Sequence, residues 1–107
     1  MYIVLFCTTK NQKEAKKISK KLLNKKLVAC SNITKRVDSL FSWKNKVESE
    51  KESLMILKSK KKLFKKICKI IKKHHSYETQ EIIAIPIVEG EKSYLKWIDS
   101  TCQGKSC

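Results

Sequence analysis

Residues 47–58, VESEKESLMILK, change character halfway along what is predicted to be one strand. Residues 48–53 are polar, whereas residues 54–57 are wholly apolar. Only the second part can lie in the core of its own domain, so the first part, with Phe41 and Trp43 opposite, is predicted to project as a hairpin arm. Exposed aromatic side chains beside free strand edges need cover. The sequence therefore predicts an oligomer in which another copy of the chain covers the arm.

The N-terminal stretch predicts a central strand followed by a helix. Residues 2–8 form a continuous apolar run, rich in β-branched and aromatic side chains, which is typical of a strand buried on both faces. From about Asn11 the apolar spacing becomes helical, with lysines on the opposite face. Asn11 can cap this helix, with Glu14 three residues later. The predicted buried face of the helix consists of Ala15, Ile18, Leu22 and Leu23.

A hairpin is predicted in the middle of the chain. Its first strand runs from residue 27 to 37, and the chain stays extended through residues 41–43. Lys44 and Asn45 follow, and asparagine tolerates the positive φ that a tight hairpin turn requires. Residues 47–58 then return as the partner strand.

The C-terminal half predicts a helix, a strand and a second, short helix. Residues 61–74 are amphipathic, and residues 81–88 form the last strand, with Pro86 at an edge or a bulge because proline cannot donate to a ladder. Gly90 precedes the short C-terminal helix. The buried stripe of the first helix is Leu63, Ile67, Ile70 and Ile71, and the packing face of the short one is Tyr94, Leu95, Trp97 and Ile98.

These elements predict an α+β fold, a ferredoxin-like β-α-β-β-α-β sandwich with an extended hairpin and a short C-terminal helix. Residues 1–107 are predicted to form a single domain, with a tail from Gln103 that frays. No stretch approaches the roughly 20 apolar residues that span a bilayer. Residues 1–9 lack the flanks of a signal peptide. We therefore expect a cytoplasmic protein without a membrane partner.

The cysteines argue against two common roles. There are five of them, an odd number without a C-x-x-C pair, which speaks against a disulfide framework and a closed zinc site. Cys7, Cys30 and Cys68 lie in predicted strands or a helix and are interpreted as small buried hydrophobes. Cys102 and Cys107, in the tail, could chelate or crosslink, but no neighbouring residue supports either role.

The formal charge of +15 raises the question of nucleic-acid binding. Arg36 is the only arginine, and surfaces that recognise guanine edges usually combine arginine forks with lysines. The lysines instead fill the polar faces of the two main helices. We interpret them as a solvated surface in a lysine-rich chain, and we expect no specific nucleic-acid partner.

Several short motifs occur in a fixed order along almost the whole chain. They are Cys7-Thr8-Thr9, Ala29-Cys30-Ser31-Asn32-Ile33, Ser39-Leu40-Phe41-Ser42-Trp43-Lys44-Asn45, Glu52, Lys58, His74-His75-Ser76-Tyr77-Glu78-Thr79-Gln80-Glu81-Ile82, Pro86-Ile87, Gly90 and Tyr94-Leu95-Lys96-Trp97-Ile98. Together they resemble the CutA divalent-cation tolerance family. Two positions depart from its pattern: Asn45 replaces a usual glycine, and Gln80 replaces a usual proline.

The resemblance implies a ferredoxin-like subunit in a tight homotrimer, whose long hairpins pair with neighbouring subunits. It also implies binding of copper or another divalent cation, with a role in metal tolerance. Carried over by position, the metal ligands would be Cys7, His74 and His75.

The residue types of this trio suit copper, because copper favours imidazole and thiolate donors. Neighbouring residues on a helix point about 100° apart, so His74 and His75 can hold one ion only if the helix has already ended. The alternative is that both histidines merely complement the carbonyl end of the helix. A partly open site, or one ligand per subunit, fits the sequence better than a closed cage.

A second candidate site is a cleft between subunits formed by Tyr77, Glu78 and Glu81, with Lys58 and Trp43 reaching it. Two carboxylates and a phenol can hold a cation or a polar ligand. Alternatively, the carboxylates bind lysines or loop amides between subunits. We see no nucleophile with a base and no phosphate-binding loop, so an enzyme is not expected.

The same order of elements is compatible with three other functions. A PII-like trimer would sense a small anionic metabolite in clefts between subunits, lined by Lys58, Tyr77 and Glu78. An RNA-recognition module needs stacking aromatics on the third strand, and residues 52–58 contain none. A metallochaperone needs a C-x-x-C loop, and only Cys7 is present after the first strand.

Overall fold

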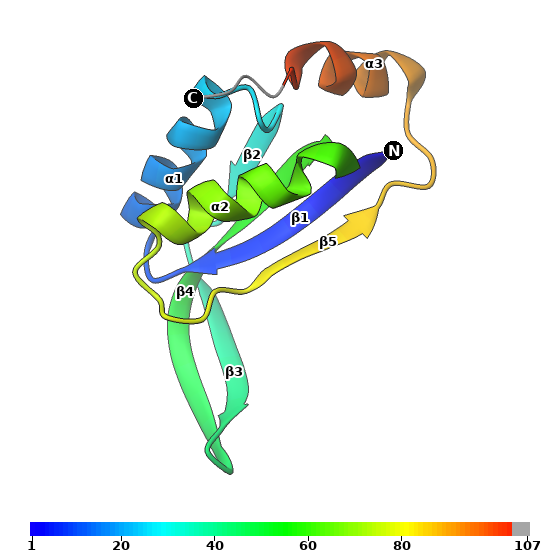
Figure 1. The fold of residues 1–107 in the computed structure, drawn as a ribbon. Coiled ribbons are helices and arrows are strands. Elements are labelled where there is room, and N and C mark those ends of the chain that lie inside the picture. Colours follow the sequence, from blue (N-terminus) through cyan, green and yellow to red (C-terminus); the bar gives the residue numbers. More distant parts are fainter. Residues whose placement is uncertain (104–107) are drawn as a thin grey trace.

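The structure is a computed structural model that describes residues 1–103. Five strands form an antiparallel sheet in which the first strand is central, as predicted (Figure 1). The order is β2-β4-β1-β5, and β3 pairs with the far part of β4. The strands are β1 (Tyr2–Thr9), β2 (Cys30–Ile33), β3 (Val37–Trp43), β4 (Lys46–Lys60) and β5 (Ile82–Pro86).

The two main helices cover one face of this sheet (Figure 1). They are α1 (Gln12–Asn24) and α2 (Phe64–His74), and a 3₁₀ turn, η1 (Lys61–Leu63), leads into α2. Asn11 caps α1 as predicted, since its side chain accepts a hydrogen bond from the Glu14 amide. The short helix α3 (Lys92–Thr101) follows β5. The predicted ferredoxin-like α+β fold with a terminal helix is confirmed.

The core lies between the sheet and the two helices. Side chains along β1 alternate, with Ile3, Leu5 and Cys7 buried under the helices and Val4 and Phe6 only half-buried on the other face. The expectation that this strand is buried on both faces is therefore wrong for the single chain, because no helix covers the second face. The main fully buried partners of β1 are Ile18, Leu22, Met55, Leu57, Ile67, Ile71 and Ile98.

The segment predicted as a strand over residues 27–37 and as extended chain through residues 41–43 forms two strands, which begin at Cys30 and Val37 and are separated by a bulge. Ile33 pairs with Met55 and Val37 with Glu52, so residues 34–36 face only Ser53 and Leu54 of β4. The Leu54 amide donates to the Thr34 hydroxyl, and the Ser53 hydroxyl donates to the Lys35 carbonyl. An extra residue in one strand bends it and increases its twist. The bulge therefore lies where the hairpin leaves the main sheet.

Beyond the bulge, β3 and β4 form the projecting arm that the sequence predicted (Figure 1). Lys44 and Asn45, with φ of 49° and 64°, form its two-residue turn, as expected for a type I′ hairpin. Trp43 is 55% and Val47 79% exposed, and every residue from 46 to 51 is exposed. The arm thus has no core of its own.

Some helix faces and strand ends differ from the predictions. Leu23 is exposed rather than buried, because α1 closes at Lys26, whose φ is 58°, in a Schellman-type end. On α3 only Ile98 is fully buried, whereas Tyr94 and Trp97 stack on each other and stay half-exposed.

The last strand is also shorter than predicted, Ile82–Pro86 rather than residues 81–88. Pro86 does lie on an edge strand, as expected. At the C-terminus, the Gln103 side chain donates to carbonyls of α3. The rest of the predicted fraying tail, including Cys107, lies outside the described residues. Within residues 1–103, no helix has the length and apolarity to cross a membrane.

Candidate functional site

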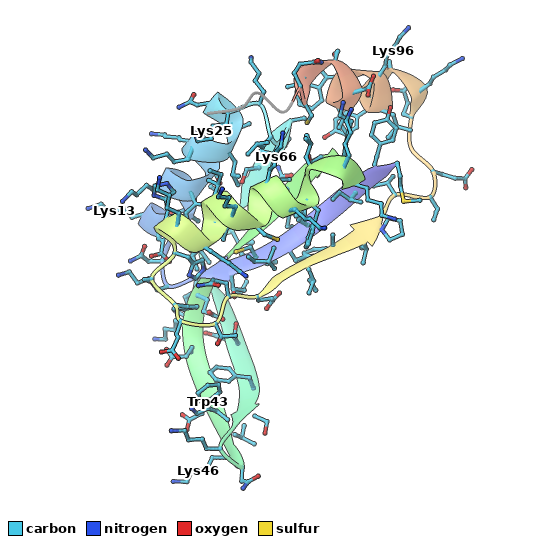
Figure 2. All side chains as sticks on the ribbon, in the orientation of Figure 1. Lys13, Lys25, Trp43, Lys46, Lys66 and Lys96 are labelled. Atoms are coloured by element: carbon cyan, nitrogen blue, oxygen red, sulfur yellow. The ribbon has the colours of Figure 1, made fainter. Side chains whose placement is uncertain are left out.

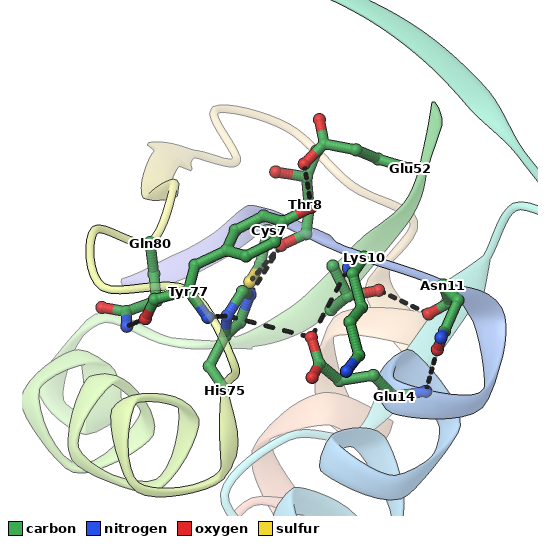
Figure 3. Close-up of polar contacts among 10 residues, drawn as sticks. Cys7, Thr8, Lys10, Asn11, Glu14, Glu52, His75, Tyr77 and Gln80 are labelled. Carbon is green, nitrogen blue, oxygen red and sulfur yellow. Dashed lines mark hydrogen bonds and ion pairs between the residues drawn. The ribbon is translucent and has the colours of Figure 1, made fainter. Parts of the chain in front are cut away.

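A buried histidine organises the base of the arm (Figure 3). The His75 side chain is fully buried, with its Nε2 2.7 Å from the Thr8 carbonyl oxygen. Its Nδ1 lies 3.0 Å from the Tyr77 amide nitrogen and 3.9 Å from a Glu14 carboxylate oxygen. The Tyr77 hydroxyl donates to Glu52 at 2.8 Å, and the two rings of His75 and Tyr77 are in contact. The site therefore connects β1, α1, the loop after α2 and the start of the arm.

The partners of His75 define its tautomer. The Tyr77 amide can only donate, so Nδ1 accepts, and the Thr8 carbonyl can only accept, so Nε2 carries the proton. Helix α2 ends at His74, and His75 is already extended, with φ −92° and ψ 139°. The helix has thus ended, as a shared metal site would require. However, both ring nitrogens of His75 are engaged by the protein itself.

Cys7 lies close to His75 but is sealed in the core. Its side chain is fully buried, and its Sγ contacts the same Thr8 carbonyl oxygen at 3.7 Å. Burial, followed by the nearby carboxylates of Glu81 and Glu14, raises the pKa of the Cys7 thiol to about 12. The thiolate, which is the metal-binding form, is therefore strongly disfavoured at neutral pH.

His74 lies at the other side of the helix end and in different surroundings. Its pKa is lowered, first by partial desolvation and then by the charges of Lys21, Lys73 and Lys17. A neutral imidazole can bind a metal, but the same lysines repel a cation. Among residues 1–103, no group of three or more His, Cys, Asp or Glu side chains is placed to hold a metal ion. The structure thus brings Cys7 and His75 together and leaves His74 apart.

The predicted cleft residues do not form one cluster within the chain. Tyr77 lies beside Glu52, whereas Glu78 and Glu81 are exposed on the following loop. Lys58 lies on the uncovered face of the sheet, where its ammonium contacts Asn32. Trp43 lies far out on the arm (Figure 2).

Burial also raises the pKa of Tyr77. Desolvation, then the hydrogen bond to Glu52, raises the pKa of the phenol well above its usual range. Gln80, which departs from the family pattern, donates from its side chain to the Tyr77 carbonyl and so fixes the loop by a hydrogen bond instead of a proline ring.

Two hollows within residues 1–103 differ in their position relative to the predicted site residues. One, of about 460 Å³, is lined by Lys72, Glu78, Thr79 and Gln80, next to the Tyr77 loop. The other, of about 1030 Å³, lies away from the predicted sites. Its lining residues are Met1, Ile3, Lys61, Lys62, Phe64, Lys65, Ala84 and Pro86.

Sequence reasoning missed three partners in the histidine network. Glu14 was assigned only to helix capping, yet its carboxylate also lies near His75. Glu52 was noted as a motif residue without a partner, and it accepts from Tyr77. The Thr8 backbone carbonyl carries no sequence signal at all. A half-buried carboxylate beside a tyrosine can be found only once strand register is known.

The sheet order β2-β4-β1-β5, the two helices on one face and the bulged hairpin arm define a ferredoxin-like α+β subunit with an extended hairpin. Comparison with known proteins then identifies the family. The family model "CutA1 divalent ion tolerance protein" matches residues 3–101, and the chain belongs to this family.

Curated relatives and solved structures named CutA or CutA1 support the same family assignment. The divalent-cation tolerance protein CutA of Archaeoglobus fulgidus is 41% identical over 103 residues, covering 96% of this chain and all of that one. Its structure superposes with a TM-score of 0.93, with the same coverage. CutA1 of Oryza sativa gives a TM-score of 0.92 at 31% identity, covering 95% and 94% of the two chains. The fold match therefore extends over the whole subunit.

Several curated relatives are longer than this chain. Chloroplastic CutA of Arabidopsis thaliana is 33% identical over 99 residues, which is 92% of this chain and 54% of the relative. Human CutA is 34% identical over 101 residues, which is 94% of this chain and 56% of the relative. The chain thus spans about half the length of these plant and mammalian proteins.

Proposed function

We propose that this chain acts as a homotrimer that binds divalent cations, copper first among them, in the response to metal ions. The observation that carries the proposal is the bare hairpin arm. Phe41 is 40% and Trp43 55% exposed on a two-stranded ribbon, which is at most marginally stable alone in water. Another copy of the chain is the simplest cover for it.

The uncovered face of the sheet supports the same assembly. Ile83 and Ile85 on β5 are about half exposed, and they pair with Phe6 and Val4 of β1 on the same face. Ile56 lies beside Phe6 on the other side. Apolar surface that extends over three strands is uncommon on a monomer and typical of an interface.

Light scattering coupled to size exclusion tests the assembly. We expect a mass three times that of the 12.5 kDa chain. Replacing residues 38–51 with an Asn-Gly turn joins the paired residues Val37 and Glu52 and keeps the main sheet. This variant should be a folded monomer by circular dichroism. A folded, monomeric wild type at micromolar concentration would refute the proposal.

The proposed cation ligands are Cys7, His74 and His75. As folded, they do not form one site, because His75 is held by Thr8 and Tyr77 and the Cys7 thiol is sealed in the core. What supports the proposal is the family, whose name refers to divalent cations, and the preference of copper for these donor types. Binding through His75 requires the loop of residues 75–81 to move.

Calorimetric titration of Cu²⁺ and Cu⁺ tests the ligands one at a time. His74→Gln removes an imidazole from the surface, and His75→Gln removes the buried one. Loss of binding in both variants supports a shared site, whereas loss in His74→Gln alone supports a single ligand per subunit. Isotherms of the double variant that match the wild type would exclude both histidines.

A second candidate function is a PII-like sensor of a small anionic metabolite. The observation that favours it is the hollow of about 460 Å³ beside the Tyr77 loop, in which Lys72, Thr79 and Gln80 can donate hydrogen bonds and Glu78 can bind a positive group of the same ligand. A thermal shift caused by a metabolite and unchanged by a chelator would favour this function. A shift that the chelator abolishes would favour cation binding.

The cytoplasmic location and the absence of catalysis remain predictions. Cys7, Cys30, Cys68 and Cys102 are free thiols, which suits a reducing compartment. The Archaeoglobus fulgidus structure is described as periplasmic and the Arabidopsis thaliana relative as chloroplastic. Localising the tagged chain by cell fractionation tests the first prediction.

A further inference from the structure

The net positive charge of the chain lies in one layer of the fold. Residues 10–26 and 60–74, which include α1, η1 and α2, contain 16 lysines and one acidic residue, Glu14. The rest of the chain contains nine basic and nine acidic residues and is therefore neutral. The entire excess of +15 thus lies on the helical layer.

These lysines lie in the helical layer, on the side of the sheet opposite the uncovered apolar face. Figure 2 shows Lys13, Lys25 and Lys66 projecting outward from the two helices. Lys60 is paired with Asp99, at 3.2 Å. The exposed lysines of this surface include Lys13, Lys16, Lys17, Lys20 and Lys21 on α1 and Lys61, Lys62, Lys65, Lys69, Lys72 and Lys73 on η1 and α2.

A general lysine bias does not explain this distribution. Such a bias would load every exposed segment, yet the fully exposed arm strand from Lys46 to Lys51 contains two lysines and two glutamates and is neutral. Like charges on neighbouring turns of a helix destabilise it. Charge held together at a cost to the fold suggests an anionic partner.

We propose that the exposed face of α1 and α2 binds the phosphate backbone of duplex nucleic acid without regard to sequence. Lysines act as point charges that neutralise phosphates and release counterions, which needs no fixed geometry. The chain's single arginine, Arg36, lies outside this face and pairs with Asp38. The face therefore lacks the forked donors that recognise base edges.

The same face fits a single strand or a lipid surface less well. Sequence-independent binding of single strands uses aromatic side chains on which bases stack. Membrane adsorption uses apolar side chains that enter the bilayer, in addition to charge. On the described part of α1, η1 and α2, Leu23, at 38%, is the only large apolar side chain with substantial exposure. A duplex, which offers phosphates alone, matches the face best.

Fluorescence anisotropy with labelled 20-base-pair duplexes tests this proposal. We expect two unrelated sequences to bind with affinities within about twofold of each other, because only phosphates are contacted. If four or five phosphates are neutralised, the logarithm of the affinity should fall with the logarithm of salt with a slope of about −4. Between 50 and 200 mM NaCl that slope corresponds to a loss of roughly 250-fold.

A matched pair of variants locates the surface. The face variant carries Lys16→Gln, Lys20→Gln, Lys65→Gln and Lys69→Gln, and the control carries Lys35→Gln, Lys51→Gln, Lys92→Gln and Lys96→Gln. Both lose four charges, and glutamine keeps helix propensity. We expect the face variant to lose at least tenfold in affinity at 100 mM NaCl and about 3 units of salt slope, and the control to lose less than threefold.

Several outcomes would overturn the proposal. Equal losses in the two variants would show that net charge alone attracts the duplex. A slope shallower than −1 in the wild type would exclude the neutralisation of several phosphates. Tighter binding to vesicles with 30% anionic lipid, or to a single strand of equal length, would assign the face to that partner instead. Each comparison is made at the same pH, with circular dichroism confirming the fold of each variant.

Discussion

The two halves of β4 have the same secondary structure for different reasons. In residues 53–59, buried and half-buried side chains alternate, and β1 and β2 pair on either side. In residues 46–51, every side chain is exposed and only β3 pairs with the strand. The inner half is held by the core, and the outer half by one ladder and one turn.

The inner half of β4 is stabilised by the core of the chain, and the outer half is not. A two-stranded ribbon buries little apolar surface, so its backbone hydrogen bonds alone leave it marginal in water. The bulge at residues 34–36 turns the ribbon away from the helices that could have covered it. Within the chain, the arm therefore lacks the core contacts that stabilise the inner half of β4.

The largest contrast should come from truncating one side chain in each half. Leu57 is fully buried, so Leu57→Ala should lower the free energy of unfolding by about 2–5 kcal/mol through lost burial and a cavity. Val47 is 79% exposed, so Val47→Ala in the arm should change it by less than about 0.5 kcal/mol in the monomer. Urea unfolding at one protein concentration measures both, and equal effects would contradict the division of β4.

The next comparison is between His75, which is buried at the base of the arm, and its neighbour His74. His75→Ala removes the partner of the Thr8 carbonyl and of the Tyr77 amide, and should cost about 1–3 kcal/mol of stability. His74→Ala removes no such buried bond and should cost less than about 0.5 kcal/mol. Thermal and urea unfolding of both variants measure this difference. A larger loss of stability in His74→Ala than in His75→Ala would mean that the hydrogen bonds of His75 do not stabilise the base of the arm.

Much of the fold was predictable because its signals are local. The apolar run of residues 2–8, the cap at Asn11 and the turn at Lys44 and Asn45 each depend on a few neighbouring residues. The projecting arm followed from the polar half of residues 47–58. The bulge did not, because an extra residue in one strand is defined only by its register against the other.

The candidate site was less predictable because its contacts are distant in sequence. His75 and Thr8 are 67 residues apart, and Tyr77 and Glu52 are 25 apart. The sequence predicted donor types and the end of the helix near His74, and the structure agrees on the latter. It gave no sign that backbone groups would occupy both nitrogens of His75. Choosing donors by type alone therefore overestimated how open this site is.

Alkaline pH should destabilise the region around His75, at the base of the arm, more than the arm itself. Folding raises the pKa of Cys7 from 9.0 to about 12 and also raises that of Tyr77 above its usual 10.0. The unfolded chain therefore loses these protons first, so their stabilisation is complete below about pH 9 and is lost as the pH rises towards the folded values. Tyr77→Phe should cost about 1 kcal/mol at pH 7 and make the decline above pH 10 less steep.

Urea unfolding of wild type and Tyr77→Phe from pH 7 to 11 measures this effect. Cys7→Ala is the second variant of the experiment, because it should reduce the part of the decline that begins near pH 9, to which the raised pKa values of Cys68 and Cys102 also contribute. If both variants lose stability with pH as steeply as the wild type, other groups are responsible for the alkaline transition.

The smallest difference in stability is expected between variants of two residues with a left-handed backbone conformation. They are Lys26 at the end of α1 and Asn45 at the tip of the arm. A side chain at positive φ is strained, and glycine removes the strain. Lys26→Gly should raise the free energy of unfolding by about 0.5–1 kcal/mol, because the turn at Lys26 leads directly into the buried Leu27. Lys26→Ala is the control that removes the same charge but keeps the strain, and it should give no such gain.

Asn45→Gly relieves a smaller strain, because asparagine already tolerates this conformation. It also acts where no core residue depends on the turn, so global unfolding should change by less than about 0.3 kcal/mol. Amide hydrogen exchange, which reports local opening, should nevertheless show more protection in β3 and β4 near the turn. A gain in global stability as large as that of Lys26→Gly would mean that the arm unfolds together with the core, because only a cooperative unit transmits the relief of strain at its tip to the whole fold.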